Sequence, residues 1–334
     1  MATFLTSDAI RHELFSGYVE QALVQNSSFL NSGIVTTDPD VDAAAKSSES
    51  AEAQIKFITE LDGTSKIASG TSATAITPNK LSTGIYRAVK HFRTEAWEQA
   101  QLSKFFVGKD PLANVAAQIA SYWDRQIQKV LISTVVGVFA DNAANDSGDM
   151  IVNVATDGAG AVGSGEKISS GLIIDAMSTL GDAMGLAGIA MHSTVYYNLL
   201  RQQLITVVPA SEQRSEFSVY QGKFVIVNDN LPAVAGTNRI TYHTYLFGLG
   251  AVAYADGAHP EAFADKIDEA AYNGAGSKMI ISRKNFVIHP QGWEFKSVSI
   301  GEISPSNAEL EEAQQWDRKA PRKLCKIACI KTNG

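Results

Sequence analysis

The sequence predicts an α+β fold, in which helices and strands mix without a repeating order. A long apolar stripe of helical period follows Asp110 and Pro111, and short apolar runs typical of strands recur between 224 and 254. The regular strand–helix–strand alternation of a doubly wound sheet is absent. The chain has 334 residues, of which 45% are hydrophobic and 19% charged, so it can bury a sizeable core as one large domain or two.

Residues 1–50 are a poor match for a packed domain. They open with an amphipathic stretch, with Ser7 or Asp8 as a candidate N-cap. Its apolar residues recur at helical spacing: Phe15, Tyr18, Val19 and Ala22. The following stretch, 26–52, is rich in Ser, Asp and Ala, so we expect it to be extended rather than packed in its own subunit. A disordered tail and an arm ordered by a neighbouring molecule remain alternatives.

Residues 54–78 predict a thin hairpin. Apolar and polar residues alternate from Gln54 to Leu61, the turn Asp62-Gly63-Thr64-Ser65 follows, and a second run with little apolar content ends at Pro78. An isolated two-stranded hairpin is marginally stable in water. We therefore expect this hairpin to lie on something else.

A long helix over 111–139 is the clearest local prediction. Asp110 is a candidate N-cap, Pro111 fits the first helical position, and we expect the helix to break at Gly137 and the loop after it. At about 100° per residue, one stripe is apolar: Leu112, Ala116, Ile119, Trp123, Ile127, Val130, Thr134 and Val138. The other face is polar: Asn114, Gln118, Ser121, Arg125 and Gln128. About 27 residues would span roughly 40 Å.

The rest of the chain predicts a mixed sheet with short helices. Residues 142–170 read as a surface loop, flexible at 158–165. A second helix would turn Ile173, Met177, Leu180 and Met184 inward. The elements expected after it are a strand at 189–191, a helix from about 194 to 204, strands near 224–227, 240–247 and 251–254, and closing runs at 278–289 and 293–300.

Two motifs suggest chemistry without supporting it. The glycines of 247–253 resemble a dinucleotide fingerprint, but no helix start follows, so we interpret them as a bent strand pair. His192 and Ser193 resemble a base with its nucleophile, but adjacent residues at a strand end point to opposite sides. We expect Ser193 to be a helix N-cap and His192 a half-buried structural residue.

The other histidines and the two cysteines also lack the spacing of a metal-binding site. The histidines at 12, 91, 243, 259 and 289 have no metal-binding spacing, and Cys325 and Cys329 predict reduced, unpaired thiols. We therefore predict no catalytic, cofactor-binding or metal-binding residues, no cofactor and no enzyme activity.

The basic C-terminal stretch, 316–334, has two interpretations. It can be a solvated tail that offsets the acidic segment 302–312. Alternatively it contacts an acidic neighbour, for which the N-terminal segment offers Asp38, Asp40, Asp42 and Glu49.

Charge and hydropathy exclude two classes of protein. The net charge of −7 gives no basic footprint of a dedicated nucleic-acid binder. Acidic residues stand in the opening stretch where a signal peptide has an apolar core, and no apolar run approaches about 20 residues. We expect a protein made in a cytoplasm, without membrane contact.

Several short segments, collinear over most of the chain, resemble the major capsid proteins of tailed bacteriophages. They are Val89–Arg93, Gly108–Leu112 with Tyr122 and Trp123, Ile189–Ser193, Phe247–Ala253 and Ile288–Trp293. The resemblance implies the Hong Kong 97 type of capsid fold. It implies an N-terminal arm at 1–50, an extended hairpin loop at 51–85, a peripheral domain at 86–142 and 278–334 with a spine helix at 111–139, and an axial domain at 143–277.

The function that the resemblance implies is mechanical. Pentamers and hexamers of the chain would close into an icosahedral shell around viral double-stranded DNA. Scaffolding and portal proteins, and decoration proteins in some relatives, would be partners, and contact with the packaged DNA would be non-specific. The expected location is the virion capsid, assembled in the host cytoplasm. An encapsulin-like protein compartment and a cytoplasmic α/β enzyme are the alternatives.

Overall fold

The computed structural model confirms an α+β fold with a mixed order of helices and strands. It describes residues 32–47, 52–58, 63–65, 83–100, 115–183, 185–202, 205–208, 217–257, 265–270 and 277–334. None of the helices in these ranges is both long and apolar enough to cross a membrane.

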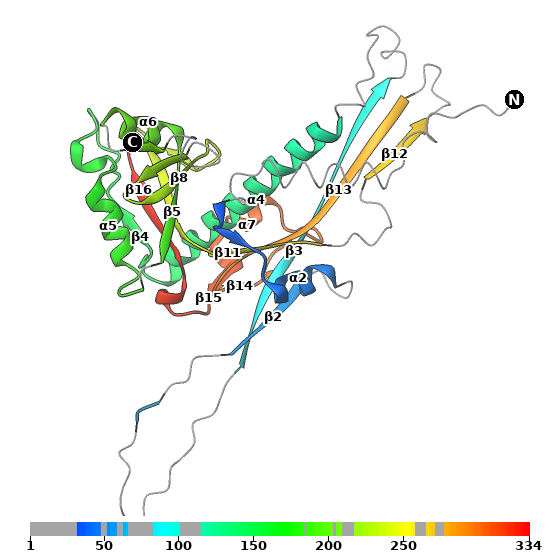
Figure 1. The fold of residues 1–334 in the computed structure, drawn as a ribbon, viewed down its shortest axis with the longest axis horizontal. Helices are drawn as coiled ribbons and strands as arrows, with labels where there is room; N and C mark the ends of the chain where they lie inside the picture. Colours follow the sequence, from blue (N-terminus) through cyan, green and yellow to red (C-terminus); the bar gives the residue numbers. More distant parts are fainter. Residues whose placement is uncertain are drawn as a thin grey trace, which may run out of the picture.

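A six-stranded sheet forms the elongated part of the molecule (Figure 1). Its strand order is β1 (Val35–Thr36), β11 (Val252–Asp256), β13 (Ser277–Pro290), β3 (Thr83–Ala100) and β2 (Glu52–Ile58), with β12 (Asp265–Ala270) also on β13. β3 and β13 pair antiparallel from Lys90↔Val287 to Ala100↔Ser277. β2 pairs with the opposite end of β3, from Glu52↔Val89 to Ile58↔Thr83. The sheet is therefore elongated, and only a few strands pair at each of its two ends.

An eight-stranded sheet forms the second part. Its order is β4 (Ile151–Asn153), β16 (Ile327–Thr332), β10 (Ile240–Gly248), β5 (Leu186–Met191), β8 (Lys223–Val227), β7 (Phe217–Tyr220) and β6 (Thr206–Val208), with β9 (Ala233–Ala235) on β10. The predicted strands at 189–191, 224–227 and 240–247 are thus confirmed.

Successive residues along these strands belong to two different hydrophobic cores. Leu246, Ala328 and Ile330 pack with α5 (Ser170–Ser178) and α6 (Ser193–Arg201) on one face. Tyr245, Phe247 and Cys329 belong to the main core, shared with α4 (Val115–Asn145). The rings of Tyr245 and Phe139 of α4 stack with centroids 5.3 Å apart. Successive residues of a strand point to opposite faces, so the central strands are covered on both sides.

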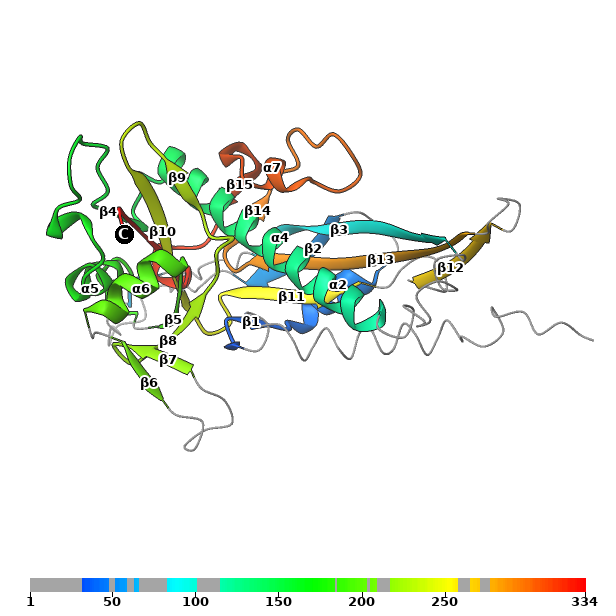
Figure 2. The same ribbon diagram turned by 90° about the horizontal axis from the view of Figure 1, so that it is seen from above.

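The helix predicted at 111–139 is present as α4, which lies along the six-stranded sheet (Figure 2). The expected stripe is buried at every position whose side chain is described: Ile119, Trp123, Ile127, Val130, Thr134 and Val138. Two details were wrong. The helix ends at Asn145, and from Val130 to Phe139 it is buried almost all round rather than along a narrow stripe. Residues 111–114 lie outside the described residues.

Gly137 explains why the helix does not break there. A Cβ at this position would lie 1.9 Å from the carbonyl oxygen of Leu310 and 2.5 Å from Nε1 of Trp316. The glycine lets α7 (Asn307–Leu310) and β15 (Trp316–Arg318) approach the helix backbone. β15 pairs with β14 (Trp293–Phe295), which is shorter than the predicted run 293–300.

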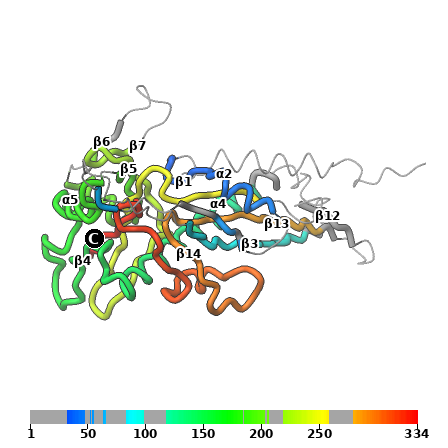
Figure 3. The backbone as a smooth tube through the Cα atoms, turned by 90° about the horizontal axis from the view of Figure 1, so that it is seen from below, coloured from blue at the N-terminus to red at the C-terminus, as the bar shows by residue number. Residues whose placement is uncertain are grey.

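The N-terminal segment 32–47 is packed in its own subunit, contrary to the extended stretch that we expected. β1 pairs in parallel with β11, and α2 (Pro39–Lys46) lies beside it (Figure 3). The side chains of Ile34, Val41 and Ala45 are buried. Asp38 caps α2 by accepting a hydrogen bond from Asp40 N at 2.9 Å, and Pro39 occupies the first turn. The amphipathic stretch before Ser32 lies outside the described residues.

The basic C-terminal stretch is not a solvated tail. β16 runs between β4 and β10, and Ile327 to Ile330 are buried. The basic residues before it pair within the subunit: Arg318 with Asp146 and Asp149, Lys319 with Glu294 and Asp317, and Lys323 with Asp182.

Three further boundaries differ from the prediction. The hairpin limit at 85 falls inside β3, and the predicted turn at 62–65 and second run to 78 lie largely outside the described residues. The loop 142–170 contains the end of α4 and β4. β11 belongs to the six-stranded sheet, although it falls within the expected axial domain, 143–277. β16 belongs to the eight-stranded sheet, although it falls within the expected peripheral segment, 278–334.

Candidate functional site

The residues that suggested catalysis do not form a catalytic arrangement. Nδ1 of His192 accepts a hydrogen bond from Thr194 N at 3.2 Å, so His192, and not Ser193, caps α6. Asp229 accepts from the backbone N–H of Ser193 at 3.2 Å, and the Ser193 hydroxyl also lowers the pKa of Asp229. The acid therefore contacts the serine directly, whereas a nucleophile needs the histidine next to its hydroxyl. His192 is partly buried, as expected.

The glycine-rich turn at 247–253 joins two strands. β10 ends at Gly248 and β11 starts at Val252, so no helix N-terminus is available to a phosphate. A Cβ on Gly248 would lie 2.4 Å from the carbonyl oxygen of Gly185, and Gly250 has φ +66°. The two strands belong to different sheets, so the interpretation as a strand pair was wrong, while the close backbone approach at the glycines is confirmed.

The thiols are unpaired and buried. Burial raises the pKa of Cys325 to about 11 and that of Cys329 to about 12, so both are neutral thiols near pH 7. Within the described ranges, no group of three or more His, Cys, Asp or Glu side chains is placed to hold a metal ion.

A small satellite core at the root of the hairpin is the first candidate for a functional site. We call it the hairpin root: Val41 and Ala45 of α2, Ile55 of β2, Ala88 of β3, Ala253 and Ala255 of β11, and Val287 of β13. Most of these side chains are small, so five elements meet with little apolar area between them. Here the N-terminal segment and the projecting ribbon of β2 and β3 are attached to the body.

Lys90 of β3 links the N-terminal segment to the sheet by hydrogen bonds. Its Nζ donates to the carbonyl oxygen of Ser47 at 2.5 Å and to Ser47 Oγ at 3.0 Å, at the C-terminal end of α2. The side chain is buried, and desolvation lowers its pKa. Sequence reasoning missed this residue, because the segment Val89–Arg93 was recognised only by resemblance.

Two buried histidines lie on the strands next to the hairpin root. His91 of β3 is fully buried, its ring stacks on Phe286 at 5.1 Å, and desolvation lowers its pKa to about 3. His289 of β13 is 4% exposed, and desolvation lowers its pKa to about 4. Both rings are therefore neutral near pH 7.

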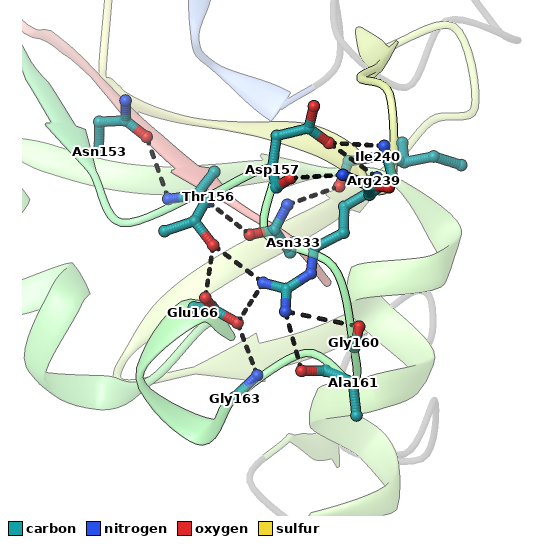
Figure 4. Close-up of polar contacts among 12 residues, drawn as sticks. Asn153, Thr156, Asp157, Gly160, Ala161, Gly163, Glu166, Arg239, Ile240 and Asn333 are labelled. Atoms are coloured by element: carbon teal, nitrogen blue, oxygen red, sulfur yellow. Dashed lines mark hydrogen bonds and ion pairs between the residues drawn. The ribbon is translucent and has the colours of Figure 1, made fainter.

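A polar network is the second candidate, where β4 and β16 end and β10 begins (Figure 4). Nη1 of Arg239 donates to Glu166 Oε2 at 2.6 Å and to Thr156 Oγ1 at 2.9 Å, and Nη2 donates to the Ala161 carbonyl oxygen at 2.9 Å. Hydrogen bonds from Thr156 and Arg239 lower the pKa of Glu166 to about 2. The network ties the loop after β4 to the β9–β10 hairpin.

Asp157 and Asn333 complete this network. Both carboxylate oxygens of Asp157 accept backbone N–H groups of residues 237–239 at 2.8–2.9 Å, which lowers its pKa. Asn333, after β16, accepts from Thr156 N at 2.8 Å and donates to the Ile240 carbonyl oxygen at 3.0 Å. The loop that composition predicted to be flexible is thus hydrogen-bonded at several points. The only signals in the sequence were turn residues such as Asp157-Gly158.

Both candidates fix backbone segments and expose no reactive group. The hairpin root attaches the N-terminal segment 32–47 and the ribbon of β2 and β3 to the body, and the Arg239 network holds the loop after β4 on the β9–β10 hairpin.

Comparison with known proteins gives a consistent result. A family model described as "Major capsid protein 13-like" matches residues 46–324. The major capsid protein of Bacillus phage SPP1 is 33% identical over 99% of this chain and 98% of its own length. The capsid of Ralstonia phage GP4 superposes with a TM-score of 0.61 at 10% identity, over 90% of this chain and 87% of that one. The capsid of cyanophage Pam1 gives 0.56 at 12% identity, over 93% of both chains.

Proposed function

Because the chain belongs to the family of 13-like major capsid proteins, which build the icosahedral shells of tailed phages, we propose that it forms pentamers and hexamers around double-stranded DNA. The family is one of structural proteins rather than enzymes. The family match and the full-length relative are viral, which favours a virus shell over an encapsulin-like compartment.

The observation that carries the finer proposal is the narrow ribbon of β2 and β3. It is attached through a root of mostly small side chains, and Ile85 on β3 is 48% exposed. A ribbon of this kind gains little from its own subunit and more from a neighbour that covers it. Many such weak contacts add up once the copies are held in one lattice.

We propose the domain roles that the resemblance implies, adjusted to the sheets. Residues 1–50 would be the arm, with 32–47 as its docked base, and 51–85 the extended hairpin. Residues 86–142 and 278–334 would form the peripheral domain and 143–277 the axial domain. The sheet order supports moving β11 to the peripheral part and β16 to the axial part.

The proposed partners follow from the shell. Scaffolding and portal proteins would meet the chain during assembly in the host cytoplasm, and decoration proteins would bind the finished surface. Contact with DNA would be non-specific and weak, because the net charge of −7 provides few counter-charges for phosphates.

Electron microscopy of the purified chain tests the proposal. Negative staining with sedimentation velocity should show rings and closed shells, and shells from infected cells should contain nuclease-protected DNA. A chain that stays monomeric at every concentration, with or without its scaffolding protein, would contradict the proposal. Shells that hold protein cargo in place of DNA would favour the compartment.

A further inference from the structure

The loop 296–305, between β14 and α7, exposes two large aliphatic side chains. Ile303 is 76% exposed, the highest value among the exposed large hydrophobic residues of the described ranges, and Val298 is 58% exposed. Ile300 between them packs against the main core. The loop projects from the body next to α7 (Figure 2). Two largely exposed aliphatic side chains on one projecting loop indicate a contact surface. We call this loop the knob.

Hydrogen bonds hold the knob in one shape. The fully buried Gln315 accepts from Val298 N at 3.0 Å and donates to the Ser299 carbonyl oxygen at 3.4 Å. Glu309 Oε1 accepts from Gly301 N at 2.8 Å. The exposed side chains are therefore presented on a preorganised backbone, which lowers the entropic cost of binding.

The two ends of the knob are fixed as well. Arg93 of β3 donates to the Pro305 carbonyl oxygen at 2.7 Å, and Ser304 Oγ accepts from Phe92 N at 3.2 Å. At the other end Ser297 has φ +53°, a left-handed conformation that is unfavourable for a residue with a Cβ. Backbone strain of this kind persists where the surrounding structure enforces it, and it concentrates at functional positions.

The same chain carries a hollow that fits an aliphatic side chain. A cavity of about 360 Å³ opens between α2, the hairpin root and the C-terminal segment. Its apolar lining includes Val41, Ile55, Ala253, Ala320 and Leu324, and Leu324 is 47% exposed. Pockets of about 300–1,000 Å³ accept small ligands or a few side chains.

Charge gives the knob and the hollow a preferred orientation. Glu302 is exposed next to Ile303 on the knob. Lys326 is exposed and lines the hollow, whose acidic lining residues are Asp38 and Asp40. A knob seated in the hollow is therefore favoured with Glu302 against Lys326 and away from the two aspartates.

We propose that the knob of one copy seats in the hollow of a second copy, with Ile303 beside Leu324 and Glu302 beside Lys326. The contact uses two different patches, so it is head-to-tail and propagates into rings or nets rather than stopping at a dimer. It rests on the proposed shell function and names one of the contacts that hold the shell.

Assembly of point variants tests this contact. Ile303→Asp and Leu324→Asp should each lower particle yield by at least about tenfold. The melting temperature of the unassembled subunit should stay unchanged, because both side chains are exposed. Ile174→Asp is the matched control, since Ile174 on α5 is 58% exposed and outside the contact; it should assemble normally.

A charge exchange identifies the partner surface. Glu302→Lys and Lys326→Glu should each reduce assembly, and the double variant should recover most of the yield. Normal assembly of Ile303→Asp would overturn the contact, including the case in which the knob binds a decoration protein instead. A double variant no better than the single ones would overturn the pairing with the hollow. Failure of the wild-type chain to assemble would count against the proposed function itself.

Discussion

The central strands of the eight-stranded sheet and the strands β3 and β13 of the six-stranded sheet bury their side chains to different extents. In the eight-stranded sheet, Leu246 and Ile330 pack under α5 and α6, while Tyr245 and Phe247 pack against α4, all at most 1% exposed. On β3 and β13, Ile85, Phe92 and Met279 are 36–48% exposed. The central parts of β10 and β16 are thus covered within one chain, although Val227, Val234 and Ile240 elsewhere in that sheet are 42–53% exposed. The strands β3 and β13 leave apolar surface that another molecule can cover.

This difference separates stability from assembly. Changes in the doubly covered core should unfold the subunit, whereas changes on the ribbon and the knob should spare the subunit and impair the shell. The hairpin root lies between these cases, because it is small and yet joins the segment 32–47 and the ribbon of β2 and β3 to the body.

Two N-terminal deletions should have the largest and most informative effects. Removing residues 1–50 deletes Ile34, Val35 and Val41, each worth about 1.5–3 kcal/mol when buried. It should therefore lower the melting temperature and abolish shells. Removing only 1–31 keeps this packing, so it should leave the melting temperature intact while preventing closed shells. Calorimetry and electron microscopy of both variants check this. Equal melting temperatures would show that 32–47 contributes nothing to the fold.

Truncation of Trp123 should destabilise the subunit by about 3–5 kcal/mol. Its ring is 2% exposed in the middle of α4, and its Nε1 donates to Ser282 Oγ of β13 at 2.8 Å. Trp123→Ala should yield insoluble or unfolded protein. Arg125→Ala, on the exposed face, should change stability by less than about 0.5 kcal/mol. Denaturant unfolding measures both, and a soluble Trp123→Ala with wild-type stability would contradict the packing.

Gly137→Ala should destabilise by about 1–3 kcal/mol, because the new methyl group overpacks the contact with Leu310 and Trp316. Alanine is the better helix former by about 1 kcal/mol, so a helix without this contact would be stabilised instead. Gly165→Ala is the control, since a Cβ there meets nothing within 4 Å. A loss of stability in Gly137→Ala would support the close contact with Leu310 and Trp316, and a gain of stability would contradict it.

Acid should destabilise the six-stranded sheet through His91 and His289. Their folded pKa values, about 3 and about 4, lie below the ordinary value of 6.5, so the unfolded chain binds protons first. Stability is full above pH 6.5 and falls as the pH drops toward 3 for His91 and toward 4 for His289, by about 1.4 kcal/mol per histidine at pH 5.5. Arg93 opposes protonation of His91, and Asp38 favours that of His289. Melting temperature against pH should be flatter for His91→Phe than for wild type, and parallel curves would exclude this histidine.

Several helices and strands could be predicted from the sequence, but the distant residues that they contact in the fold could not. The apolar stripe of α4 was visible as a pattern, whereas α2 was missed because the Ser-, Asp- and Ala-rich composition of 26–52 favoured an extended segment. That α4 continues past Gly137 depends on Leu310 and Trp316, which are far away along the chain. The basic C-terminal stretch concealed β16, because the lysines around Ile327 to Ile330 dominated its composition while the sheet buries the apolar run.

The Arg239 network and the Lys90 contact were beyond the sequence for the same reason. Arg239 meets Glu166 and Lys90 meets Ser47 only after the sheets have formed. The resemblance to capsid proteins identified the fold, but the packing of 32–47 against β11 had to come from the structure.

Hydrogen exchange of the free subunit and of the assembled shell tests the central claim most directly. Amides of β2 and the paired half of β3, residues 52–58 and 83–89, should exchange readily in the free subunit and become strongly protected in the shell. Amides of β5, β10 and β16 should be equally protected in both states. Equal protection of the ribbon before and after assembly would contradict the claim that neighbouring copies stabilise it.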